Sequence, residues 1–191
     1  VQVASVAHQT GKKQVLSETF ALCGWDVSFE ELKQIYEWQM VRGINLLCQH
    51  LEGYSLRGIR KRDYPATLFY QQPWWSEYRK LNDVFSRLGM LLSEGKVKFE
   101  TLVVHPMSSA WICFNNKDNG LLRELDEKFM QTIHSLEENQ IQYDLGDERI
   151  MQLHGSVTGN VLNVGQMSYR VVLVPDALNL APETVDLLEQ F

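Results

Sequence analysis

The sequence predicts an α/β fold in which short parallel strands alternate with amphipathic helices. Strand-like and helical apolar patterns follow one another along the chain, which is typical of parallel sheets joined by right-handed crossovers. The 191 residues suffice for one or two domains, and 45% hydrophobic with 22% charged residues is ordinary for a globular protein. No apolar run approaches the ~20 residues of a membrane-spanning helix.

The N-terminal part of the chain contains the first strand–helix unit. Residues 1–10 carry apolar side chains at helical spacing and end at Gly11, a good helix terminator. Residues 12–20 then have the pattern of a short strand. Ser28 and Glu31 form an S-x-x-E capping box, which predicts that a helix begins there.

A second strand–helix unit follows directly. Gly43 is placed to end the preceding helix, and residues 44–48 are continuously apolar, as in a strand covered on both faces. The segment 49–75 is too long for an ordinary connection, so we expect it to be functional. Residues 76–95 form a strong amphipathic pattern, which predicts a helix.

The pattern restarts after a polar segment at 93–98, where we expect a domain boundary. Strands are predicted over 99–106, 141–145 and 169–176. A long helix is predicted from the apolar face formed by Leu122, Leu125, Phe129, Ile133 and Leu136. A short helix is expected over 147–154, and Pro182 suits the first turn of a last helix.

Charge and cysteine content argue against several classes of protein. The net charge is −6 with the acids spread along the chain, which argues against nucleic acid as a partner. Cys23, Cys48 and Cys113 fit neither a disulfide framework nor a zinc site, so we expect reduced, buried thiols. The first residues lack the pattern of a secretory leader. The chain does not begin with Met and helical patterns run into both ends, so we expect a segment of a larger polypeptide.

Candidate functional residues follow the first two predicted strands. In α/β proteins ligands bind at the carboxyl ends of parallel strands, and these two strands should be neighbours facing one cleft. The residues concerned are Glu18 and Trp25 after the first strand, and His50, Glu52, Tyr54 and Arg57 after the second. Carboxylates, an imidazole, guanidinium groups and aromatic faces together suit a polyhydroxylated substrate.

Each candidate also has a structural explanation. Glu18 lies between apolar segments, where an unpaired charge is costly, so it is either a satisfied structural acid or a group tuned for chemistry. His50 can equally be a hydrogen-bonded structural histidine, and the aromatic residues of the long segment can serve its packing. The basic residues can form a solvated loop; they are Arg57, Arg60, Lys61 and Arg62.

The second half of the chain offers no catalytic set of its own. Ser108 and Ser109 follow the strand at 99–106, but no glycine accompanies them. Because a phosphate loop needs glycine, this disfavours an independent nucleotide- or flavin-binding domain. Cys113 lacks the context of a nucleophile elbow.

Five segments then occur in an order that resembles one family. They are SETFALCGWDVSFEELK, RGINLLCQH, LLSEGKVKFETLVVHPMSSAW, YDLGDERI and YRVVLVPD. This order resembles the large bacterial glycoside hydrolases of the α-L-rhamnosidase type, family 106, and more loosely it is similar to family 42 β-galactosidases. In such enzymes a catalytic (β/α)8 barrel (a TIM barrel) is followed by a flavodoxin-like domain that resembles class I glutamine amidotransferases.

The resemblance implies a domain arrangement and a catalytic residue. Residues 1–95 would be the last two strand–helix units of the barrel, and residues 96–191 a truncated flavodoxin-like accessory domain. Glu18 would match the glutamate at the end of the seventh barrel strand, which acts as general base or nucleophile. Its partner acid would lie on an earlier strand. The other candidates would contact the sugar.

Further expectations concern ligands and partners. Besides a carbohydrate substrate, the resemblance implies a calcium requirement whose ligands the sequence does not place. Neither nucleic acid nor a membrane is expected as a partner, and the rest of the barrel or a second copy of the chain would complete the fold. The location stays open, with the bacterial cytoplasm favoured. The alternative function is a non-catalytic carbohydrate-binding or assembly module.

Overall fold

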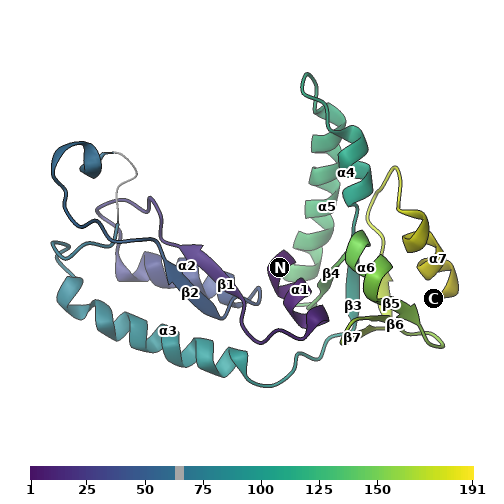
Figure 1. Ribbon diagram of the computed structural model, residues 1–191, viewed down its shortest axis with the longest axis horizontal. Helices are drawn as coiled ribbons and strands as arrows, with labels where there is room; N and C mark the ends of the chain where they lie inside the picture. The colour runs from purple at the N-terminus through teal and green to yellow at the C-terminus, as the bar shows by residue number, and fades with distance from the viewer. Residues whose placement is uncertain (63–66) are drawn as a thin grey trace. The chain divides into compact units, whose positions relative to one another are not determined.

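The computed structural model describes residues 1–62 and 67–191, and the chain divides into two compact units (Figure 1). The smaller unit is Lys13–Lys96, and the larger unit combines Val1–Lys12 with Val97–Phe191. Each unit contains strands that pair in parallel, as the alternation of strands and helices predicts.

The smaller unit contains a parallel strand pair and two long helices. Its elements are β1 (Leu16–Thr19), α2 (Phe29–Met40), β2 (Leu46–Gln49), the 3-10 helices η1 (Gly58–Lys61) and η2 (Trp75–Glu77), and α3 (Tyr78–Ser93). β1 and β2 pair along their whole length, from Leu16 opposite Leu46 to Thr19 opposite Gln49. The order agrees with the prediction, and residues 63–66 of the predicted long segment lie outside the described part of the chain.

The side chains of β1 and β2 alternate between two faces. Leu47 packs on the core formed by α2 and α3, whereas Leu16 and Leu46 are exposed on the opposite face. The apolar run at 44–48 predicted cover on both faces, but both helices share one core and so cover only one. Cys48 lies on the exposed face, so the expected burial of its thiol is wrong, although all three cysteines are free.

Helices α2 and α3 hold the strand pair through a shared core. The rings of Tyr36 and Phe85 meet edge to face, with centroids 4.4 Å apart. Gly89 allows α3 to approach the backbone before β2, because a Cβ at this position would lie 2.5 Å from the carbonyl oxygen of Asn45. The core also contains Phe20, Val27, Leu32, Met40, Leu68 and Leu81.

The predicted capping box at the start of α2 is confirmed. The Ser28 hydroxyl accepts a hydrogen bond from the Glu31 N–H at 3.2 Å, and the Ser28 N–H donates to the Glu31 carboxylate at 2.7 Å. We expect Ser28→Ala to lower the free energy of unfolding of the smaller unit by about 1 kcal/mol, because one helix-terminal N–H loses its acceptor. Urea unfolding would measure this. Ser86→Ala, on the exposed side of α3, is the matched control and should cause no loss.

The larger unit combines a parallel sheet with a small antiparallel sheet. Its elements are α1 (Gln2–Thr10), β3 (Thr101–His105), α4 (Met107–Cys113), α5 (Gly120–Glu138), β4 (Asp144–Asp147), α6 (Glu148–His154), β5 (Gly155–Val157), β6 (Leu162–Val164), β7 (Met167–Tyr169), β8 (Val171–Leu173) and α7 (Pro182–Gln190). The parallel sheet has the strand order β4-β3-β8, and the antiparallel sheet has the order β5-β6-β7. Helices α1, α5, α6 and α7 agree with the predictions, whereas α4 was not predicted.

The predicted strand at 169–176 is corrected by the structure. Tyr169 ends β7 and Val171 begins β8, and these strands belong to different sheets. Gly165, with a φ of 57°, forms a two-residue turn that returns the chain from β6 to β7. β8 pairs with β3 alone among the described strands, so it is an edge strand. The side chain of Val171 is exposed, whereas the prediction was a buried strand.

Helix α1 joins the larger unit through side-chain hydrogen bonds to β4. The Ser5 hydroxyl accepts from the Leu145 N–H at 2.8 Å, and the Gln9 amide donates to the Leu145 carbonyl at 3.0 Å. The predicted first domain, residues 1–95, includes this helix. The structure instead packs it with Val97–Phe191, because its buried polar side chains find their partners on β4.

A buried carboxylate strengthens the same contact. Asp144 on β4 is almost completely inaccessible, and its oxygens bond the His8 Nδ1 at 2.8 Å and the Tyr169 hydroxyl at 2.7 Å. Burial, together with the Asp144 charge, raises the pKa of the Tyr169 hydroxyl. Two segments that are distant in the sequence, α1 and β7, are thereby tied to β4.

Candidate functional site

The ends of β1 and β2 bring one predicted pair of site residues together. Glu18 lies opposite Cys48 in the parallel register, and side chains two residues apart on a strand point the same way, so His50 shares the face of Glu18. The His50 Nδ1 lies 3.0 Å from the Glu18 Oε1. The His50 N–H also donates to the Thr19 carbonyl at 2.8 Å, which extends the pairing one residue beyond β2.

The two members of this pair differ in their exposure. The side chain of Glu18 is 62% exposed, whereas that of His50 is only 15% exposed. The Glu18 carboxylate is therefore not buried, although its position between two apolar segments of the sequence suggests burial. One carboxylate oxygen of Glu18 is hydrogen-bonded to His50, and the side chain remains accessible, so a ligand can reach it.

The backbone immediately after Thr19 adopts a rare conformation. Phe20 has a φ of 72° and Leu22 a φ of 57°, in the left-handed region that bulky side chains seldom adopt. The Phe20 ring is 2% exposed and packs in the α2–α3 core, which compensates for this strain. Such outliers concentrate at functional sites, and here the outlier lies two residues from Glu18.

Two further hydrogen bonds tie the strand ends to the helices. The Gln39 amide on α2 donates to the buried Thr19 hydroxyl at 2.8 Å. The Gln49 amide at the end of β2 donates to the Asn82 side-chain oxygen on α3 at 2.6 Å. Gln39 and Asn82 were not predicted from the sequence. The feature that could have identified them is a polar residue on the partly buried side of an amphipathic helix.

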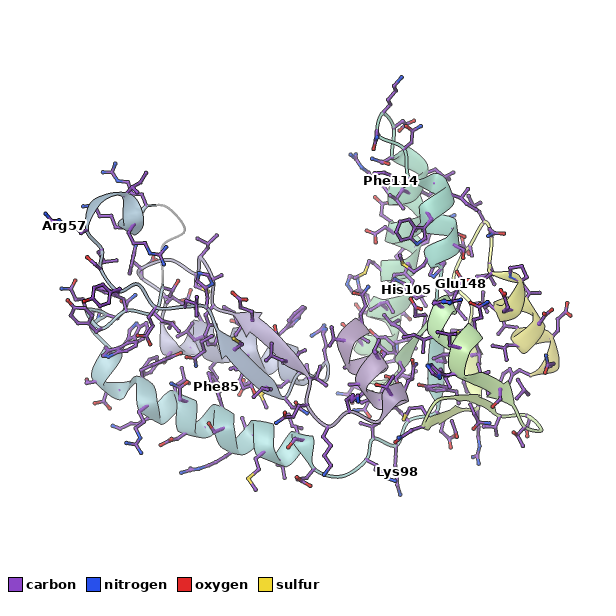
Figure 2. The ribbon with its side chains drawn as sticks, in the orientation of Figure 1. Arg57, Phe85, Lys98, His105, Phe114 and Glu148 are labelled. Atoms are coloured by element: carbon purple, nitrogen blue, oxygen red, sulfur yellow. The ribbon has the colours of Figure 1, made fainter. Side chains whose placement is uncertain are left out.

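The other predicted site residues lie more loosely around this pair. Trp25 follows β1 and is exposed, and Glu52 lies close enough that its charge, after burial, contributes to the raised pKa of the Tyr78 hydroxyl. Tyr54 is fully exposed, and Figure 2 shows Arg57 on the outer rim of the loop that carries η1. Within the described residues no hydrogen bond or ion pair joins Tyr54 or Arg57 to Glu18.

The expected cleft is not enclosed by the strand pair alone. A hollow of about 420 Å³ lies elsewhere, on the outer side of α2 around Trp38. This hollow is lined by the single helix α2 and its end, and none of the predicted site residues lines it. The two neighbouring strand ends form only one side of the Glu18 site, and other segments would have to form the remaining sides of a cleft.

Across residues 1–62 and 67–191, no three His, Cys, Asp or Glu side chains are grouped so that they could hold a metal ion. In the same part of the chain, every helix is too short or too polar to cross a bilayer.

The carboxyl edge of the larger unit's parallel sheet is closed by its own side chains. Glu148 is buried, and its carboxylate accepts hydrogen bonds from the N–H groups of Ser108, at 2.9 Å, and Ala181. Burial opposes ionisation, but these bonds outweigh it and lower the pKa of Glu148. Figure 2 shows His105 next to Glu148, and burial lowers the pKa of His105 despite the nearby acids.

Ser109 closes the same edge from the other side. Its hydroxyl donates to the Asn179 carbonyl at 2.7 Å and accepts from the N–H groups of Leu178 and Asn179, each at 2.9 Å. The polar groups of Ser109 and Glu148 are thus engaged by the segment that follows β8. This agrees with the lack of a phosphate loop in the sequence.

Comparison with known proteins adds a structural relationship. No family model and no curated protein matches the chain. Among solved structures, a rhamnosidase from Novosphingobium sp. PP1Y matches 97% of this chain with a TM-score of 0.63 and 16% sequence identity. The match covers 17% of the rhamnosidase chain. At this identity the similarity shows the fold alone: the chain shares its fold with a segment of a bacterial rhamnosidase.

Proposed function

We propose that this chain is part of a glycoside hydrolase that cleaves glycosidic bonds with a pair of carboxylates, and that Glu18 is one of them. The observation that carries the proposal is an accessible carboxylate held by His50 at the carboxyl ends of two parallel strands. The fold similarity to a rhamnosidase segment supports the same reaction class. An α-L-rhamnoside is therefore the first substrate to test.

The proposed enzyme has a (β/α)8 barrel of which the smaller unit forms the last two strand–helix units. Its helices cover one face of β1 and β2, and the exposed face with Leu16, Leu46 and Glu18 would point into the barrel. Remaining strands would cover that face and pair with the open strand edges. The larger unit would be a flavodoxin-like accessory domain.

Glu18 can act in either of two ways in such an enzyme. As a general base, it would accept a proton from water while the water oxygen attacks the anomeric carbon. As a nucleophile, it would attack that carbon itself and form a glycosyl ester that water then hydrolyses. In both cases a second, protonated carboxyl group from an earlier strand would donate its proton to the leaving oxygen.

The direct test is hydrolysis of aryl glycosides by the intact polypeptide that contains this chain. We expect release of 4-nitrophenol from an α-L-rhamnoside, and a galactoside and a glucoside would test the choice of sugar. If no glycoside is cleaved and the protein still binds a monosaccharide in calorimetry, the chain belongs to a carbohydrate-binding protein. If it neither cleaves nor binds, the carbohydrate assignment is wrong.

A second candidate function, assembly without catalysis, is favoured for the larger unit. The edge where a ligand would bind is closed by Glu148 and Ser109. A domain with this edge closed can still serve as a scaffold. Removal of the larger unit should then change the oligomeric state or stability of the intact protein, measured by light scattering, more than its kcat.

A further inference from the structure

We infer that His50 is a positioning residue that acts through Glu18 rather than by contacting the sugar. This inference rests on the proposed function of Glu18. The sequence alone suggested a substrate contact or a structural histidine, and the geometry points to a third role. His50 would fix the orientation of the carboxylate before substrate binds.

The hydrogen bond between the two residues has a defined direction. A carboxylate can only accept, so the Nδ1 of His50 must carry the proton that lies between it and the Glu18 Oε1, 3.0 Å away. Rotation of a glutamate carboxylate about its last torsion is otherwise broad. The Nδ1–H restrains this rotation and selects which oxygen faces the accessible side.

The donor is held more firmly than the acceptor. The His50 main chain is bound to the Thr19 carbonyl at 2.8 Å, and its ring is 15% exposed. Glu18 keeps 62% of its side chain accessible. In a substrate-binding histidine we would expect the opposite, with the ring reaching into solvent and the acid buried behind it.

The backbone of Glu18 is already restrained by its neighbours. Thr19 is held by the Gln39 amide at 2.8 Å, and the Phe20 ring is buried in the core. The main freedom left to Glu18 is therefore in its own side chain. His50 acts on that freedom, and misplacement of a catalytic group by about 1 Å can lower a rate about 100-fold.

Kinetics of the intact enzyme on an aryl glycoside test this role. We expect His50→Leu to lower kcat about 10- to 100-fold with KM changed by no more than about twofold, because an interaction with the acid and not with the sugar is lost. His50→Asn should recover most of the kcat, since its amide nitrogen can donate from the place of Nδ1. The kcat of His50→Gln, whose amide nitrogen lies one carbon further from the backbone, should be lower than that of His50→Asn. If His50→Leu does not fold, the comparison of these two variants tests the positioning role.

A double variant separates this inference from the proposed function. With Glu18→Gln present, His50→Leu should cause no further loss, because there is no catalytic carboxylate to orient. A double variant that shows the product of both losses would overturn the positioning role, as would a His50→Leu enzyme with higher KM and unchanged kcat. If Glu18→Gln itself retains full turnover, the proposed function fails instead.

Discussion

Glu18→Gln in the intact enzyme is expected to lower kcat by about 100- to 10,000-fold, the range that general acid–base catalysis contributes. The amide keeps the size of the side chain and can still accept the hydrogen bond from His50, but it can neither take a proton from water nor attack the anomeric carbon. Steady-state hydrolysis of an aryl glycoside measures the loss. KM should change little, because the substrate would still bind.

A matched control for this variant lies on α2. Glu30→Gln also exchanges an exposed carboxylate for an amide in the smaller unit, on helix α2 rather than on a strand. It should keep the wild-type kcat. Near-normal turnover of Glu18→Gln would contradict the catalytic role and would favour the non-catalytic carbohydrate-binding alternative.

Glu148→Ala is expected to cause the largest loss of stability. The variant would leave the partly buried N–H groups of Ser108 and Ala181 without their acceptor, at up to about 1–3 kcal/mol for each orphaned donor. Hydrogen exchange of the β3 and β4 amides would report the loss within the larger unit. Glu189→Ala, an exposed position on α7, is the matched control and should be close to neutral.

The same carboxylate should make the stability of the larger unit depend on pH. Although burial opposes ionisation, hydrogen bonds from Ala181 and Ser108 place the pKa of Glu148 below its ordinary value. Its contribution is therefore fully present above the unfolded pKa of about 4.3 and is lost as pH falls through the lower, folded value. Hydrogen exchange between about pH 6 and about pH 3 would show it. Glu148→Gln should remove this part of the pH dependence, and an unchanged slope would contradict it.

These two carboxylates illustrate how one residue type serves different purposes. Glu18 and Glu148 both lie near the carboxyl end of a parallel strand. Glu18 accepts one side-chain hydrogen bond and stays accessible, whereas Glu148 is buried on two backbone N–H groups. Exposure and number of partners, rather than position along the strand, separate the proposed catalytic acid from the structural one.

Sequence reasoning was strongest where the signal is contained within one or two helical turns. The capping box at Ser28, the terminator at Gly11 and the first-turn proline at Pro182 all placed helix ends that the structure confirms. Hairpin signals were also present but overlooked: Gly159 and Gly165, both with positive φ, mark the two turns of the β5-β6-β7 sheet. These turns place Tyr169 in the antiparallel sheet, apart from the strand that begins at Val171.

The sequence by itself determined the alternation of strands and helices in the smaller unit, the ends of several helices and the position of Glu18 near a strand end. These features depend on local backbone preferences and on apolar periodicity. The tertiary structure alone decided that His50 meets Glu18 across 32 residues and that Ser108 meets Glu148 across 40. It also decided that α1 joins the larger unit. Such contacts depend on strand register and on which buried polar groups find partners, and both are set only when distant segments pack together.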